Sequence, residues 1–297
     1  MKTSLKPYFQ LIRLPNVFTA AADSLAGWLL VGGSLAQPAR WLPLCGASMA
    51  IYAAGIALND VFDYEIDLVE RPNRPLPSGR VSRRFASVLG WGLLIFGILL
   101  AGASGSLASL AVGGALAACV VGYDAGLKRT VLGPEVMGSC RGLNLLLGMS
   151  QAAHLGGPVG WLVALSMTIF VVGVTWISRS EVETGKRAGP IAGLTLQDLA
   201  LVGLIGVALH TGRISPSYSA LGIVILLGVG TIVNRASIRA IRDPIPKRMQ
   251  LAVKTGVLSL VWLNVGVVAA VRGPVYALAV AALWVPAFVL GKWLYST

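Results

Sequence analysis

Residues 43–67 read PLCGASMAIYAAGIALNDVFDYEID, an apolar run that ends in four carboxylates. The apolar part, residues 43–61, has the length of a helix that crosses a bilayer, which takes about 20 mainly apolar residues. We therefore predict a membrane helix here, with its acidic end at one membrane surface.

The rest of the chain has the same character. Of its 297 residues, 56% are hydrophobic and only 12% are charged, against about 25% charged in soluble domains; the mean hydropathy is +0.76. Ten segments have the length and composition of membrane helices: 16–35, 43–61, 85–104, 106–123, 133–154, 159–179, 195–211, 217–235, 252–271 and 274–294. The sequence predicts one all-α integral membrane domain over residues 1–297.

The net charge of +12 is distributed unevenly. With the N-terminus in the cytoplasm, every lysine and arginine falls on the inner side except Arg40, Arg213 and Arg272, which fall outside, and Arg141, which falls within a helix. This asymmetry follows the positive-inside rule. We therefore expect the basic side to face the cytoplasm and to attract anionic membrane lipid, and we expect no nucleic-acid partner.

The carboxylates after residue 58 have helical spacing. On a continuous helix, Asp60, Asp63 and Asp67 would fall within about 60° of one another, with Asn59 at the edge of the same face. Such a group near lipid is destabilised by repulsion unless a cation neutralises it. Magnesium prefers one or two carboxylates, water and phosphate oxygens. The spacing predicts a magnesium and diphosphate site on the cytoplasmic side.

Residues 71–80, RPNRPLPSGR, strengthen this interpretation. Three prolines restrict the backbone, and Arg71, Arg74 and Arg80 can meet phosphate oxygens. The alternative is a solvated charged loop without function, which leaves three acids on one face unexplained.

These residues carry a family resemblance. The pattern Asn-Asp-x-x-Asp-x-x-x-Asp at 59–67, followed by Arg-Pro-x-Arg-Pro-x-Pro-Ser-Gly at 71–79, resembles the first aspartate-rich motif of the UbiA superfamily of membrane prenyltransferases, as does RLPN at 13–16. The resemblance implies a bundle of nine to ten transmembrane helices around a central cavity, Mg²⁺ as cofactor, a prenyl diphosphate donor and a hydrophobic acceptor. It also implies that Asn16 contributes to substrate binding.

The branch of the superfamily is suggested by two further stretches. Residues 138–148, GSCRGLNLLLG, and 178–182, SRSEV, are similar to the EboC-like group found in bacterial gene clusters. That similarity implies a bacterial inner (plasma) membrane protein.

The second family motif departs from its pattern. The family places two aspartates four residues apart with a Glu between them, whereas this chain has Glu181, Glu183 and Gly185 there. Gly185 removes one carboxylate, and Glu181 and Glu183 do not share a helix face. We expect Glu181 to bind metal and both glutamates to contact substrate.

Other polar residues are candidates for the same site. Tyr123 and Lys128 resemble the family's Tyr-x-x-x-x-Lys element, and an ammonium group there could bind a diphosphate oxygen; the alternative for Lys128 is a lysine that reaches the membrane surface. Arg141 and Asn144 share a helix face, and an arginine within a membrane usually faces a cavity or a partner. A structural ion pair is the alternative for Arg141, and Asp23 is likewise expected to be paired or to face a cavity.

The leading hypothesis is an intramembrane prenyltransferase. Asp60, Asp63 and Asp67 would hold magnesium with help from Asn59, while Lys128 and Arg74 would stabilise the departing pyrophosphate. The acceptor would be aromatic or otherwise lipid-soluble. One alternative is a non-catalytic relative that binds an isoprenoid-linked cargo or helps to export it. An ion-coupled transporter is a weaker alternative, because transport sites lie near the bilayer midplane.

Overall fold

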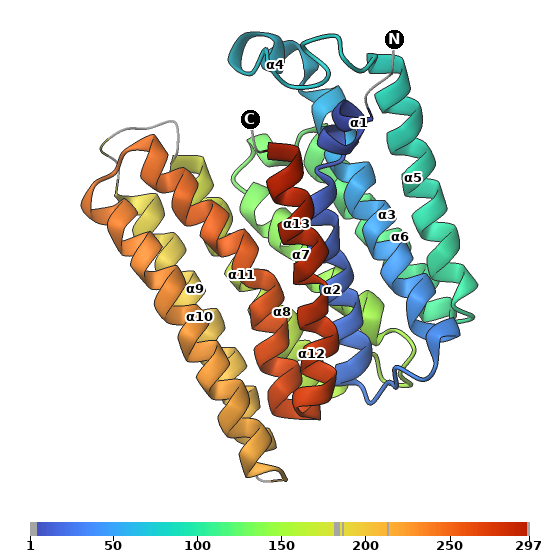
Figure 1. The fold of residues 1–297 in the computed structure, drawn as a ribbon, viewed down its shortest axis with the longest axis vertical. Coiled ribbons are helices and arrows are strands. Elements are labelled where there is room, and N and C mark those ends of the chain that lie inside the picture. The colour runs from blue at the N-terminus through green and yellow to red at the C-terminus, as the bar shows by residue number, and fades with distance from the viewer. Residues whose placement is uncertain (1–4, 181–184, 186, 213, 296–297) are drawn as a thin grey trace.

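A computed structural model of the protein describes residues 5–180, 185, 187–212 and 214–295, and every regular element within them is a helix (Figure 1). In chain order these are α1 (Lys6–Leu11), α2 (Leu14–Leu30), α3 (Pro38–Phe62), α4 (Tyr64–Glu70), α5 (Arg83–Ala103), α6 (Leu107–Ala125), the 3₁₀ turn η1 (Leu127–Arg129), α7 (Gly133–Met149), α8 (Gly157–Arg179), α9 (Ala188–Thr211), α10 (Pro216–Arg242), α11 (Pro246–Arg272), α12 (Pro274–Ala282) and α13 (Trp284–Tyr295). The predicted all-α class is confirmed.

Each of the ten predicted segments falls on one helix, except that the last is divided between α12 and α13. Eight stretches of the described chain are long and apolar enough to cross a membrane; α2 and α7 have 17 residues each and are shorter. The protein is therefore an integral membrane protein, while the number of crossings stays a prediction. Segment 195–211 was predicted too short, because α9 begins at Ala188.

Local sequence explains where the helices begin and end. Proline occupies the first position of α3, α10, α11 and α12, where its missing N–H would have had no partner in any case. Ser82 and Ser106 cap α5 and α6 by accepting a hydrogen bond from the backbone three residues on. The gap between α12 and α13 has a similar cause, since Pro286 cannot donate to the carbonyl of Ala282.

Small residues let the helices approach closely. A Cβ atom at Gly27 of α2 or Gly148 of α7 would collide with the backbone of the opposite helix, and Gly173 of α8 and Gly193 of α9 have the same relation. This packing is typical of membrane helices, whose association is not driven by the hydrophobic effect. The outward faces of α5, α9 and α10 carry exposed Leu, Ile and Val side chains, as expected for surfaces that contact lipid.

The arrangement places the acidic motif at one end of the bundle. Figure 1 shows α1, α4 and the last turn of α13 at that end, with α12 at the opposite end. Because α3 runs toward α4, the segment 59–67 lies where the chain leaves the helical bundle.

Candidate active site

The acidic motif is divided between two helices. Helix α3 ends at Phe62, Asp63 departs from helical geometry (φ −92°, ψ 8°), and α4 begins at Tyr64. The helical spacing considered for residues 59–67 is therefore interrupted at Asp63. The backbone bonds from Asp63 N–H to the Asn59 carbonyl (2.9 Å) and from Asp67 N–H to the Asp63 carbonyl (2.8 Å) persist, so the acids stay close together across the break.

One half of the motif is organised around Arg74. A single guanidinium nitrogen of Arg74 lies 2.6 Å from Asp67 Oδ2 and 3.3 Å from Asp60 Oδ1. Both carboxylates are buried. Arg13 adds a more distant pair with Asp60 (3.8 Å), and Arg71 one with Asp67 (3.6 Å). Arg74 therefore lies against two acids of the motif, while its contact with a diphosphate stays a prediction.

The other half is organised around Lys128. Its ammonium group donates to Asn59 Oδ1 (2.9 Å) and to Asp63 Oδ2 (2.7 Å). Arg129 lies 3.5 Å from the second oxygen of Asp63. The structure therefore joins the Lys128 element to the acidic motif, although about 65 residues of chain separate them. Lys128 makes these contacts as a point charge with rotatable donors.

Basic side chains neutralise the carboxylates in this arrangement. Among the described residues, no three acidic, His or Cys side chains are grouped closely enough to hold a metal ion by themselves. The donor atoms nevertheless fit magnesium, because carboxylate and amide oxygens are hard ligands. One buried oxygen, Asp67 Oδ1, accepts no hydrogen bond. The residues that could hold Mg²⁺ are Asn59, Asp60, Asp63 and Asp67.

Arg179, at the end of α8, fixes the turn that carries Lys128. Its guanidinium donates to the backbone carbonyls of Lys128 (2.9 Å) and Thr130 (2.5 Å). The sequence analysis did not assign Arg179 a role; the available signal was an arginine at the last turn of the helix before the second acidic segment. The contact links the two motif regions through the backbone of η1.

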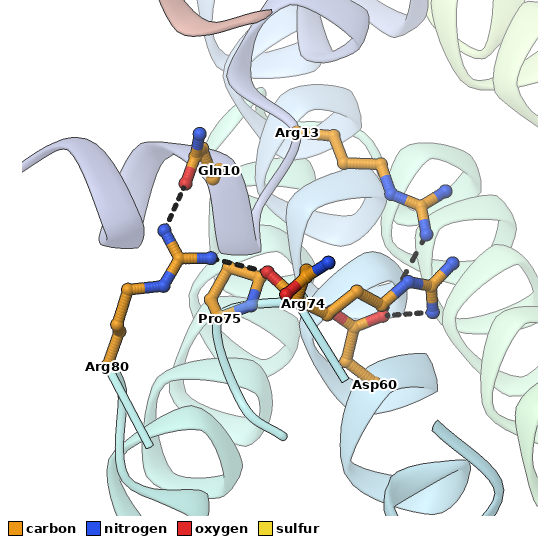
Figure 2. Close-up of a pocket in the computed structure, with 7 residues that line it drawn as sticks. Gln10, Arg13, Asp60, Arg74, Pro75 and Arg80 are labelled. Carbon is orange, nitrogen blue, oxygen red and sulfur yellow. Dashed lines mark hydrogen bonds and ion pairs between the residues drawn. The ribbon is translucent and has the colours of Figure 1, made fainter. Parts of the chain in front are cut away.

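A pocket of about 340 Å³ opens beside the Arg74 half of the motif (Figure 2). Its lining residues are Gln10, Arg13, Asp60, Asn73, Arg74, Pro75 and Arg80. Three guanidinium groups against one carboxylate give the pocket a net positive charge, which suits an anionic group.

Arg13 reaches this pocket through an unusual backbone conformation. It occupies the N-cap of α2 with φ 45° and ψ 53°, a left-handed conformation that costs a non-glycine residue about 1–2 kcal/mol. Such strain is typical of functional positions. Here it places the guanidinium near Asp60 (Figure 2).

Arg80 fastens the 71–80 loop to α1. It donates to Gln10 Oε1 (3.1 Å), to the Asn73 carbonyl (2.6 Å) and to Ser78 Oγ (2.9 Å). Gln10 in turn donates to the Leu294 carbonyl of α13 (3.1 Å). The loop, α1 and the end of α13 are therefore connected at the mouth of the pocket, a role for Gln10 that the sequence did not indicate.

Arg141 and Asn144 lie in a separate buried network. Arg141 forms an ion pair with Asp23 of α2 and donates to Thr19 Oγ1 (2.9 Å). Asn144 donates to Asp23 (3.1 Å), and Asn264 of α11 does the same (2.7 Å). The predicted pairing of Asp23 is found, and the ion-pair alternative for Arg141 describes what the structure contains.

Tyr52 of α3 lies between this network and the acidic motif. The Arg141 guanidinium lies over the ring of Tyr52, 5.5 Å from its centroid. Tyr52 and Asn59 are both partly exposed and occupy one face of α3 at helical spacing, and Asp63 follows directly after the helix. Substrate contacts for Arg141 and Asn144 stay predictions.

The remaining residues predicted for the site lie in different surroundings. Asn16 lies in the first turn of α2, and no described residue forms a hydrogen bond with its side chain. Tyr123 lies near the end of α6, where the charges of Arg179 and Asp63 act on it. Glu181 and Glu183 lie outside the described residues. Gly185 is described and has φ +91°, a conformation that an aspartate rarely adopts.

Known proteins with solved structures share this fold. A digeranylgeranylglyceryl phosphate synthase aligns over 92% of this chain and 100% of its own, with a TM-score of 0.61 and 22% identity. A UbiA homolog from Archaeoglobus fulgidus bound to GPP and Mg²⁺ aligns over 84% of this chain and 98% of its own, with a TM-score of 0.62 and 17% identity. At these identities, the likeness establishes the fold.

Curated relatives are more similar in sequence. The digeranylgeranylglyceryl phosphate synthases of Ignicoccus hospitalis and Methanopyrus kandleri are each 30% identical over 86% of this chain and over 91% and 96% of their own lengths. The Metallosphaera sedula synthase is 30% identical over 60% of this chain and 62% of its own length. The sequence model of the UbiA prenyltransferase family matches residues 20–233. The chain therefore belongs to the UbiA prenyltransferase family, and the prediction of an intramembrane prenyltransferase is confirmed at the level of that family.

Proposed function

We propose that the protein transfers an isoprenoid group from a prenyl diphosphate to a lipid-soluble acceptor, using magnesium at the first aspartate motif. The observation that carries this proposal is the joining of Asn59 and Asp63 to Lys128, beside Asp60, Asp67 and Arg74. This set combines hard oxygen donors with positively charged donors of hydrogen bonds. A magnesium–diphosphate group requires both.

The chain's own residues would bind and orient the donor. Asp60, Asp63 and Asp67, with Asn59, would hold Mg²⁺, whose charge would act as a Lewis acid on the diphosphate. Lys128 and Arg74 would exchange their contacts with the acids for contacts with phosphate oxygens. Their charges would then stabilise the pyrophosphate as its bond to the isoprenoid breaks. The apolar helices would keep water away from the allylic group until the acceptor attacks.

The acceptor is proposed from the surroundings of the site. The positively charged pocket of Arg13, Arg74 and Arg80 suits an acceptor with an anionic head group. The curated relatives are named for a glyceryl phosphate lipid, which makes such a lipid one acceptor to test alongside aromatic ones. Placement in the EboC-like branch rests on residues 138–148 and 178–182 alone.

We also propose a location and an orientation for the protein in the membrane. The acidic motif, Lys128 and the basic ends of α10 and α11 would face the cytoplasm from a bacterial inner membrane, with the N-terminus on the same side. The charge asymmetry along the sequence supports this orientation.

A second candidate function is binding without catalysis. Gly185 stands where the family motif has an aspartate, and its φ of +91° is suited to glycine. The protein would then bind a prenyl diphosphate, or an isoprenoid-linked cargo, and assist its handling or export. An ion-coupled transporter is disfavoured, because the acids lie at helix ends.

Pyrophosphate release by the purified protein separates these functions. With Mg²⁺, a series of prenyl diphosphates and both kinds of acceptor, we expect release that falls by about 10²–10³-fold in Asp63→Ala, the loss typical of removing one stabilising group at a reacting centre. Glu70→Ala, which removes an exposed acid at the end of α4, is the matched control and should release pyrophosphate normally. Absence of release from the wild type with every combination would contradict prenyl transfer.

A further inference from the structure

A further buried carboxylate lies beside the acidic motif. Asp124 is the penultimate residue of α6, and only 5% of its surface is exposed. No described residue donates a hydrogen bond to it. A carboxylate that is buried without a partner is strongly destabilised, and ionisable residues at membrane depth usually serve a function.

Helix register places Asp124 level with Asn59. Helices α3 and α6 both run toward the acidic end, and they touch where a Cβ on Gly55 would lie 2.6 Å from Val120 Cγ1. Four residues further along each helix, about one turn, are Asn59 and Asp124. The two side chains therefore belong to the same layer of the bundle.

The charges of the donor site surround this position. Lys128, Asp63, Asp60 and Arg13 all lie close enough to influence the Asp124 carboxylate. Among the described residues, Lys128 donates to Asn59 and Asp63 and forms no hydrogen bond with Asp124. A structural ion pair consequently does not account for a buried acid at this position.

We infer that Asp124 supplies an additional carboxylate ligand to the divalent cation of the donor site, from the α6 side. This inference rests on the proposed function. It explains why a carboxylate that receives no hydrogen bond from the described residues lies in this layer. The ligand class is a hard divalent cation bound together with a diphosphate.

Manganese binding tests the inference without relying on turnover. The full chain in lipid nanodiscs is titrated with Mn²⁺ in the presence of a non-hydrolysable prenyl thiodiphosphate, and free Mn²⁺ is measured by electron paramagnetic resonance. We expect Asp124→Asn to weaken Mn²⁺ binding by about tenfold or more, the scale seen when a supporting group at a metal site is lost. Asp124→Glu, which keeps the carboxylate, should retain part of the affinity. Glu135→Gln, which removes an exposed acid in the first turn of α7, should bind Mn²⁺ as the wild type does.

The possible outcomes distinguish failure of the proposed function from failure of the role inferred for Asp124. Wild-type protein that binds neither Mn²⁺ nor the thiodiphosphate would overturn the proposed function itself. Wild-type binding with unchanged Mn²⁺ affinity in Asp124→Asn would overturn the inference alone, as would an equal loss in Glu135→Gln. If Asp124→Asn does not fold, as judged by size-exclusion chromatography, Asp124→Ser is judged by the same criteria.

Discussion

Lys128 is the residue that joins the two parts of the donor site. It lies in η1, after α6, while its partners Asn59 and Asp63 lie at the end of α3. Arg179 holds the backbone of the same turn from α8. The ammonium group thus joins η1 to the end of α3, and Arg179 of α8 holds the backbone that carries it.

Replacing Lys128 by methionine tests this role. The substitution keeps the length of an unbranched side chain but leaves Asp63 without its shortest ionic contact. We expect pyrophosphate release to fall by about 10²–10³-fold, with little change in thermal stability because Arg129 still reaches Asp63. Kinetics with a prenyl diphosphate donor measure the effect. Lys254→Met, at an exposed position of α11, is the control, and an equal loss there would contradict a specific role for Lys128.

The sequence indicated the acidic and basic residues of the site but not their pairing. Helical spacing suggested one group of Asp60, Asp63 and Asp67, whereas the structure pairs Asp60 and Asp67 with Arg74 and pairs Asp63 with Lys128. Which base meets which acid depends on the approach of distant helices, as for Lys128. Asp124 and Arg179 were overlooked because a single charged residue near a helix end has no distinctive spacing.

Among the elements, α2, α7 and α11 are connected by polar contacts within an apolar bundle. Asp23, Arg141 and Asn264 come from these three helices, and all three are buried. Their sequence positions predicted that Arg141 and Asp23 each needed a partner, but 118 residues separate them. Only the packing of α2 against α7, allowed by Gly27 and Gly148, makes them partners.

A double-mutant cycle measures what this ion pair contributes. Arg141→Met leaves the Asp23 charge buried without its partner, and we expect the free energy of unfolding to fall by about 3–5 kcal/mol. The combination Asp23→Asn with Arg141→Met removes both charges and should lose less than Arg141→Met alone. The free energy of unfolding is measured by denaturant titration in detergent micelles for the wild type, Asp23→Asn, Arg141→Met and the double variant. Additive losses would show that the two residues are not energetically coupled.

For the whole molecule, the predicted hydrophobic segments were a good guide, because each bilayer crossing requires a long apolar run. The division at Leu283 between α12 and α13 was not foreseen, since hydropathy does not register the missing N–H of Pro286. Hydropathy also locates the membrane helices along the chain but does not indicate which helices pack against one another. The approach of α6 to α3, and of Arg179 in α8 to the η1 turn, could be read only from the structure.

Orientation in the membrane is testable at the two ends of α3. Glu70→Cys lies beyond its acidic end and Gln37→Cys just before its first residue, both at exposed positions. With Cys45, Cys119 and Cys140 replaced by alanine, a membrane-impermeant maleimide should label Gln37→Cys in intact bacterial cells. It should label Glu70→Cys only after the membrane is permeabilised. The reverse pattern would contradict a cytoplasmic donor site.

The most direct test of the central claim is equilibrium binding of a non-hydrolysable prenyl thiodiphosphate to the wild-type protein, with Mg²⁺ and with the metal chelated. If Asn59, Asp60, Asp63 and Asp67 hold magnesium against the diphosphate, binding should be tight with Mg²⁺, weak without it, and weak in Asp63→Ala under both conditions. Binding that is equally tight without Mg²⁺, or unaffected by Asp63→Ala, would contradict a magnesium–diphosphate site at the first aspartate motif.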